Sequence, residues 1–159
     1  TCPDEINHIN PSQDINYLFQ KRWGESHLIS GICGLPFTGK TGWTHFSSHA
    51  PTNGNIVVLF APHVGIDRDG NVGMVHQDGK KESSPACGAA IKAYEAVKAD
   101  KTEGNFKKGM FDYQMDCVKH FMVSHVDEIG SKENEMAVLP YKMYEMIQQY
   151  VEDIVDLKW

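Results

Sequence analysis

The sequence has little basic character. It contains only two arginines, Arg22 and Arg68, and no long run of lysine or arginine. Its 21 acidic side chains outnumber its 15 basic ones, which gives a formal net charge of -6. Domains that bind nucleic acid usually show a basic stripe. The composition therefore argues against a nucleic-acid partner.

Long hydrophobic runs are also missing. The longest, residues 56–62, falls far short of the roughly 20 apolar residues that a transmembrane helix requires. We therefore expect no membrane span. No targeting segment is visible in this sequence, and that leaves the cellular compartment open.

Cysteines are few and widely spaced, namely Cys2, Cys33, Cys87 and Cys117. Small secreted domains that depend on disulfides carry denser cysteine patterns. A chain of 159 residues is long enough to bury a core without such crosslinks. We therefore expect a single domain over residues 1–159, in which each thiol serves metal binding, catalysis or packing.

Apolar patterning predicts strands early in the chain and helices late. Residues 27–33 and 55–61 are predicted to be strands, and the second is apolar on both faces, as in a central strand of a covered sheet. Residues 34–44 are predicted to form a loop rich in glycine and threonine. Helices are predicted over residues 13–22, 84–99, 111–126 and 140–157. This order favours an α/β fold with a partly parallel sheet.

A phosphate-binding pattern, GxxxxGK[ST], covers residues 34–41, from Gly34 to Thr41. Such a loop must lead into a helix whose first N–H groups hold the phosphates. Here Pro51 leaves room for barely two helical turns, and Pro36 removes an N–H from the loop. The strand that follows also lacks an acidic residue for magnesium. Nucleotide binding therefore stays a minor alternative to a glycine-rich loop beside a pocket.

Three residues that favour zinc fall at the ends of predicted elements, namely Cys2, His63 and Cys87. Strand ends and helix starts meet at one edge of an α/β sheet, where such folds bind ligands. Cys87 lies in the predicted first turn of a helix, where the helix dipole favours the thiolate that a metal needs. A catalytic zinc keeps three protein ligands and one open position. The three residues are therefore a candidate catalytic zinc site.

Each candidate ligand has a simpler alternative role. A buried cysteine usually packs as a small apolar residue, His63 could bond within a turn, and Cys2 could lie at a frayed terminus. Cys33 is a competing ligand, although its apolar surroundings favour packing. Cys117 lies within a predicted helix and also favours packing. Spacing alone leaves zinc as a hypothesis.

Four blocks of sequence, in this order, resemble the limiting-CO2-inducible protein B family and the theta-type carbonic anhydrases: CPDEIN, GLPFTGKTGW, VVLFAPHVGIDRDGNVG and ESSPACGAA. The resemblance runs from Cys2 to about Tyr94. It implies a fold similar to beta-type carbonic anhydrases, with a mostly parallel central sheet flanked by helices. It also implies Zn²⁺ held by Cys2, His63 and Cys87, a homodimer, and a location in the chloroplast or cytoplasm.

The activity implied by this resemblance is the interconversion of CO2 and bicarbonate by attack of zinc-bound hydroxide. Asp4 matches the aspartate of the beta-type Cys-x-Asp-x-Arg motif and would orient the hydroxide. Ile6 stands where that motif has arginine, so a cationic partner for Asp4 would have to be Arg22 or Arg68.

A CO2 pocket should be small and mostly apolar, and Leu35, Phe37 and Val64 are its predicted lining. His49 or His45 is the predicted proton shuttle, because histidine titrates near neutral pH. The alternative is a zinc-binding family member without catalysis, acting through partners in inorganic-carbon concentration.

Overall fold

The computed structural model describes residues 15–25, 27, 29, 31–36, 39–49, 54, 57–59, 64–77, 79–106 and 112–154. Along this part of the chain the elements are α1 (Ile15–Trp23), the 3-10 turn η3 (Ile32–Gly34), α2 (Gly39–Ser47), β1 (Met74–Val75), β2 (Ser84–Pro85), α3 (Gly88–Ala99), the 3-10 turn η4 (Lys101–Gly104), α4 (Tyr113–Met122), α5 (Val126–Gly130) and α6 (Glu135–Ile154).

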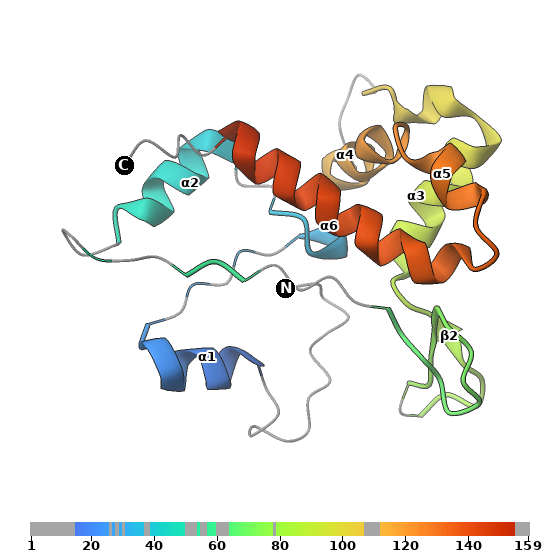
Figure 1. Cartoon of the computed structure of the whole chain (residues 1–159), viewed down its shortest axis with the longest axis horizontal. Coiled ribbons are helices and arrows are strands. Elements are labelled where there is room, and N and C mark those ends of the chain that lie inside the picture. The colour runs from blue at the N-terminus through green and yellow to red at the C-terminus, as the bar shows by residue number, and fades with distance from the viewer. Residues whose placement is uncertain are drawn as a thin grey trace.

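The long helix α6 organises the fold (Figure 1). Helices α3, α4 and α5 gather at its N-terminal end, and α2 contacts it near its C-terminal end. Buried side chains of α6 recur at helical spacing, at Leu139, Met143, Met146 and Ile147. This apolar stripe faces the same core as the buried residues of α3, α4 and α5. The core is therefore a cluster of helices.

The start of α6 shows how a local side chain sets a helix boundary. The Asn134 side-chain oxygen accepts the N–H of Ala137 at 3.2 Å, which satisfies one of the otherwise unpaired amides of the first turn. The helix therefore begins at Glu135 and includes Pro140. The sequence prediction of a helix starting at residue 140 was wrong at this end.

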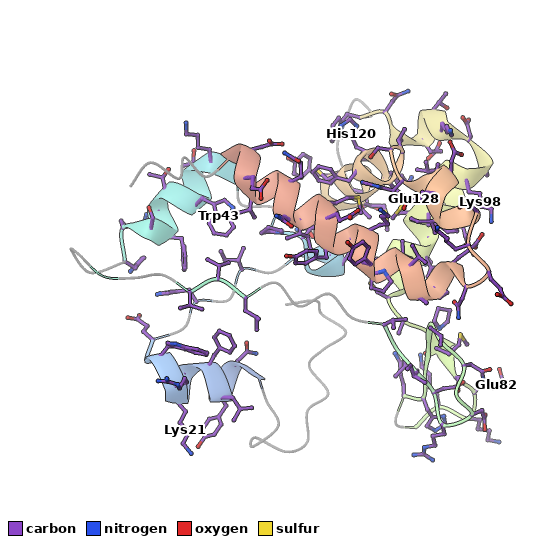
Figure 2. All side chains as sticks on the ribbon, viewed as in Figure 1. Lys21, Trp43, Glu82, Lys98, His120 and Glu128 are labelled. Carbon is purple, nitrogen blue, oxygen red and sulfur yellow. The ribbon has the colours of Figure 1, made fainter. Side chains whose placement is uncertain are left out.

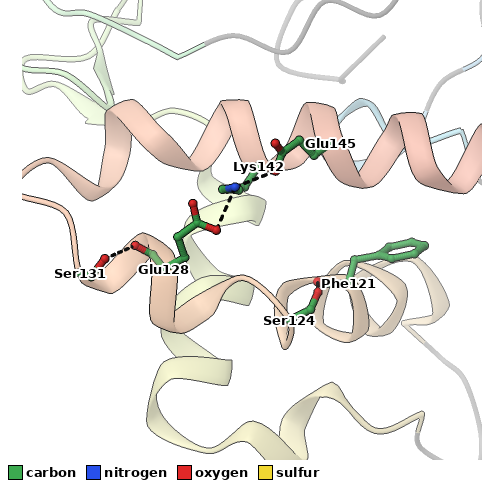
Figure 3. Close-up of polar contacts among 6 residues, drawn as sticks. All are labelled: Phe121, Ser124, Glu128, Ser131, Lys142 and Glu145. Carbon is green, nitrogen blue, oxygen red and sulfur yellow. Dashed lines mark hydrogen bonds and ion pairs between the residues drawn. The ribbon is translucent and has the colours of Figure 1, made fainter.

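The helix predicted over residues 111–126 is two helices in the structure. The Ser124 hydroxyl donates to the Phe121 carbonyl at 3.1 Å (Figure 3), and the His125 N–H donates to Met122 instead. The serine thus takes the carbonyl that a continuing α-helix would offer to His125. Helix α4 ends at Met122, and α5 begins at Val126.

The sheet consists of one small hairpin among the described residues. Strands β1 and β2 pair antiparallel, with Met74 opposite Pro85 and Val75 opposite Ser84. An isolated antiparallel bridge joins Ile66 and Val72, outside these strands. A turn follows Ile66, in which the Asp67 side chain accepts the N–H groups of Asp69 and Asn71.

Two predicted strands are not strands where the structure describes them. Within residues 27–33, the described positions 27, 29 and 31 are irregular, and Ile32–Gly34 is the turn η3. Within residues 55–61, positions 57–59 are irregular and exposed. The fold is helix-rich and consistent with an α/β class. A parallel central sheet is not seen in the described part of the chain.

Two further predictions were wrong because tertiary contacts decided the local structure. Ser84 and Pro85 were expected to open a helix, but Ser84 pairs with Val75 in the hairpin, and α3 begins at Gly88. The predicted loop over residues 34–44 contains the last residue of η3 and the greater part of α2. The first helix, by contrast, ends at Trp23 before Gly24, whose φ of 91° suits a glycine.

Candidate metal centre

Cys87 joins the hairpin to helix α3. It is the residue immediately before Gly88, where α3 begins, and its carbonyl accepts the N–H of Ile91 at 3.1 Å. The preceding Ala86 donates its N–H to the Gly73 carbonyl at 2.9 Å. Cys87 is therefore fixed from both sides, by the hairpin before it and by the helix after it. Its side chain is partly buried against the core.

A second sulfur lies beside Cys87. The Sγ of Cys33, in η3, is 3.8 Å from the Sγ of Cys87. The turn that carries Cys33 is tied to α4, because the N–H of Ile32 donates to the Gln114 side-chain oxygen at 2.9 Å. Cys33 is also partly buried against the core. Sequence reasoning had assigned Cys33 to packing and missed its pairing with Cys87.

The chemistry of these donors fits zinc. Thiolates bind Zn²⁺ at about 2.3 Å in tetrahedral geometry, which separates two sulfur ligands by roughly 3.8 Å. Among the residues that the structure describes, no group of three or more His, Cys, Asp or Glu side chains is arranged to hold a metal. The predicted ligands Cys2 and His63, and the predicted catalytic residue Asp4, lie outside the described residues. Of the predicted ligands and the predicted catalytic residue, the structure therefore describes only Cys87.

The predicted pocket residues are only partly described. Leu35 follows η3 directly and is 1% exposed within the helical core. Val64 is half-buried and precedes Gly65 in the chain segment that leads into the hairpin. Phe37 lies outside the described residues. The pocket assignment stays a prediction.

The predicted proton shuttle belongs to a group of three histidines. His49 is exposed just after α2, and its ring centroid lies 5.0 Å from that of His27 and 5.7 Å from that of His45. Phe46 also contacts this group, because its ring centroid lies 5.4 Å from that of His27. Sequence reasoning had not singled out His27, because only the fold brings it next to α2.

The phosphate-binding pattern leads into a real helix, α2, contrary to the predicted loop. The first N–H of this helix, on Gly39, donates to the Tyr150 hydroxyl of α6 at 3.1 Å. One of the amides that a phosphate would use is thus already bonded within the protein.

The remaining cysteine behaves as expected. Cys117 is 6% exposed in α4, and burial raises the pKa of its thiol. A raised pKa disfavours the thiolate, so the prediction that Cys117 packs is confirmed. The two arginines offered as partners for Asp4 are both exposed, and Arg22 lies over the ring of Trp23.

No helix in the described ranges is both long enough and apolar enough to cross a membrane. These features define a helix-rich α/β protein with paired thiols at the start of a core helix. The family model described as limiting CO2-inducible proteins B/C beta carbonic anhydrases matches residues 1–158. The chain belongs to this family.

Solved structures agree with this membership. The chain is similar to the crystal structure of PtLCIB4, a homolog of the limiting CO2-inducible protein LCIB, with a TM-score of 0.81 and 26% sequence identity over 98% of this chain and 62% of that one. It is similar to a histidine-to-alanine mutant of PtLCIB4, with a TM-score of 0.80 and 26% identity over 98% and 60% of the two chains. A serine-to-arginine mutant gives a TM-score of 0.76 and 26% identity over 98% and 62%.

The chain spans about three fifths of the length of these solved structures. No curated protein matches it.

Proposed function

We propose that the chain is a zinc-dependent carbonic anhydrase that interconverts CO2 and bicarbonate. The observation that carries this proposal is the position of Cys87, held between the hairpin and the start of α3, in a chain that belongs to a family described as beta carbonic anhydrases. Zinc when bound would act as a Lewis acid and lower the pKa of a water molecule to about 7.

The chain's own residues would have distinct tasks in this reaction. Cys2, His63 and Cys87 would hold the metal, and two thiolates would balance its charge. Asp4 would accept a hydrogen bond from the attacking oxygen and so orient it toward CO2. Leu35, Phe37 and Val64 would line an apolar site for CO2, which carries no charge. His49 would pass the released proton to solvent.

The larger fold is part of the same proposal. It includes a mostly parallel central sheet, a single domain over residues 1–159, a homodimer and a chloroplast location, and the family relationship is what supports these features. The TM-score of 0.81 over 98% of this chain supports a fold shared with PtLCIB4. The alternative is a family member that binds zinc without catalysis and acts through partners in inorganic-carbon concentration.

Metal analysis combined with stopped-flow CO2 hydration tests the proposal. The wild-type protein is expected to hold one zinc per chain and to hydrate CO2 well above the uncatalysed rate. Cys87→Ser is expected to lose both the zinc and the activity, because serine does not supply the soft thiolate ligand. Cys117→Ala, which changes a buried thiol elsewhere in the core, serves as the matched control and is expected to retain both.

Full activity in Cys87→Ser would remove this residue from the site. Bound zinc without any hydration activity in the wild type would favour the non-catalytic alternative.

A further inference from the structure

We propose that Cys33 and Cys87 form a reversible disulfide, which withdraws Cys87 from the metal. The site is a redox-modification site, and its chemical partner is a disulfide such as oxidised glutathione. The proposal for the metal rests on the proposed function, whereas the disulfide itself rests on the two sulfurs alone. The two residues are 54 positions apart in sequence, and η3 and α3 bring them into contact.

The geometry needs only a small movement. The sulfurs lie 3.8 Å apart, and a disulfide closes this distance to about 2.05 Å. The sulfurs must therefore approach by less than about 2 Å. The two backbones are anchored independently, by Gln114 on the Cys33 side and by Ile91 on the Cys87 side. We expect side-chain rotation to make most of this approach, with the surrounding helices in place.

The backbone at Cys33 supports a specific role for this side chain. Its φ of 60° lies in the left-handed region, and Cys33 is the one residue other than glycine with positive φ among those described. Glycine is the ordinary choice for such a conformation, and Gly31 and Gly34 stand close by in the sequence. A cysteine that occupies this position brings its sulfur to Cys87 at a conformational cost.

The redox step is balanced by thiol–disulfide exchange. The Cys33 sulfur attacks the glutathione disulfide, forms a mixed disulfide and releases one glutathione thiolate. The Cys87 sulfur then attacks the Cys33 sulfur and releases the second glutathione thiolate. The two thiol protons pass to the two released thiolates. Cys33 and Cys87 are oxidised, and glutathione disulfide is reduced to two glutathione molecules.

Zinc and the disulfide exclude each other at Cys87. A metal binds the thiolate, and a sulfur in a disulfide no longer supplies one. Oxidation is therefore expected to release zinc, and reduction by dithiothreitol is expected to restore the capacity to bind it. Cys33 acts as the initiating sulfur because Cys87 is the residue that zinc occupies.

The experiment treats the wild type, Cys33→Ser and Cys117→Ala with oxidised glutathione, in zinc-loaded and in metal-free form. Mass spectrometry of non-reduced peptides reads the crosslink, and a chromogenic chelator reads the released zinc. The wild type is expected to lose two hydrogens, to link the Cys33 and Cys87 peptides, and to release its zinc completely. Cys117→Ala should do the same. Cys33→Ser should keep its full zinc content and release none.

Absence of the crosslink in metal-free wild type would overturn the proposal. So would a loss of zinc from reduced Cys33→Ser, because Cys33 would then be a ligand in its own right. A crosslink in a wild-type protein that binds no zinc would confirm the thiol pair while the proposed function failed, so the two failures are distinguishable.

Discussion

Gly65 lies in close contact with the backbone of the hairpin, beside the candidate metal ligand Cys87. A Cβ added at this glycine would lie 2.7 Å from the carbonyl oxygen of Met74 and 2.9 Å from the Cβ of Ala86. Ala86 directly precedes Cys87. The missing side chain at Gly65 therefore allows the backbone contact that holds the thiol in place.

Gly65→Ala is expected to destabilise the protein by about 1–3 kcal/mol, the usual cost of overpacking, and to lower zinc affinity by displacing Ala86. Urea unfolding and a zinc titration measure the two effects. Gly88→Ala is the matched control, because a Cβ there has nothing within 4 Å and alanine favours the helix. Equal stability of Gly65→Ala and the wild type would contradict the described packing.

His49→Ala is expected to slow CO2 hydration in weakly buffered solution more than in strongly buffered solution. The reason is that a proton shuttle becomes dispensable when buffer molecules carry the proton. Stopped-flow rates at several imidazole concentrations measure the effect. Lys40→Ala, a change at an exposed position on α2, should show no such dependence. An equal loss for His49→Ala at all buffer concentrations would exclude the shuttle.

At the residue scale, the sequence suggests which chemical role a side chain could have, but it does not tell which distant residues that side chain contacts. Cys87 was singled out because its position at a helix start favours a thiolate. Cys33 was assigned to packing because its sequence neighbours are apolar. The structure shows that a residue can pack against the core and also lie 3.8 Å from a reactive partner, and no local pattern reports a contact across 54 positions.

Among the elements, α5 and α6 share an ion pair that is partly shielded from solvent. The side chain of Lys142 is 9% exposed, and its Nζ lies 2.7 Å from Glu145 on the same helix and 2.9 Å from Glu128 on α5 (Figure 3). Hydrogen bonds to Glu145 and Glu128 raise the pKa of Lys142. The bond to Lys142 lowers the pKa of Glu145 below its ordinary value of 4.5.

These two pKa shifts make the free energy of unfolding depend on pH. A lowered carboxyl pKa contributes stability that is present above pH 4.5 and is lost as the pH falls through the folded-state pKa. A raised ammonium pKa contributes stability that is present below the ordinary lysine value of 10.5 and is lost as the pH rises through the folded-state value.

Lys142→Met is therefore expected to lower the free energy of unfolding most at neutral pH, and the difference from the wild type should shrink as the pH falls below 4.5. Urea unfolding over a pH series measures this difference. Lys92→Met, on the exposed face of α3, should show no comparable trend. A difference that is constant with pH would indicate that Lys142 stabilises through packing of its stem alone.

The helices α1, α3 and α6 were predictable as elements, whereas α2 was missed, α4 and α5 were predicted as one helix, and the helix ends were imprecise. The apolar spacing from Leu139 to Ile147 identified α6, but the cap at Asn134 set its start five residues before the predicted one. The break between α4 and α5 depends on one hydroxyl, that of Ser124. Helix boundaries of this kind depend on single hydrogen bonds, and the spacing of apolar residues in the sequence does not predict those bonds.

At the scale of the whole molecule, α1 presents apolar side chains to the exterior. Tyr17, Leu18 and Trp23 are 47%, 46% and 54% exposed, and α1 lies apart from the helices around α6 (Figure 1). The charged residues Lys21 and Glu82 lie at opposite outer ends of the molecule (Figure 2). Exposed clusters of large apolar side chains are typical of interaction surfaces, which supports the proposed homodimer.

Leu18→Glu is expected to shift a homodimer toward monomer, because a buried interface would then contain an unpaired carboxylate. Light scattering coupled to size-exclusion chromatography measures the mass. Lys92→Glu, which lies on α3 away from α1, should leave the mass unchanged. A wild-type protein that is monomeric at high concentration would contradict the homodimer.

The overall architecture was predicted less well than its helices. The run IVVLFA favours burial, but a strand also needs a hydrogen-bonding partner from elsewhere in the chain. The described residues Val57, Val58 and Leu59 are exposed and irregular. For this run, hydrophobic patterning predicted neither the burial nor the secondary structure of the described residues.

The hydrogen bond between Gly39 and Tyr150 indicates that the segment GLPFTGKT has a structural role here and not its usual role of binding phosphate. The Tyr150 hydroxyl oxygen, on α6, accepts the Gly39 N–H that a phosphate oxygen would accept in a nucleotide-binding loop, so this segment links α2 to α6. A search for the sequence pattern alone would assign this protein to the ATP- and GTP-binding proteins. The bond from Gly39 to Tyr150, which lies more than a hundred residues downstream, argues against that assignment because it uses an amide that a phosphate would need.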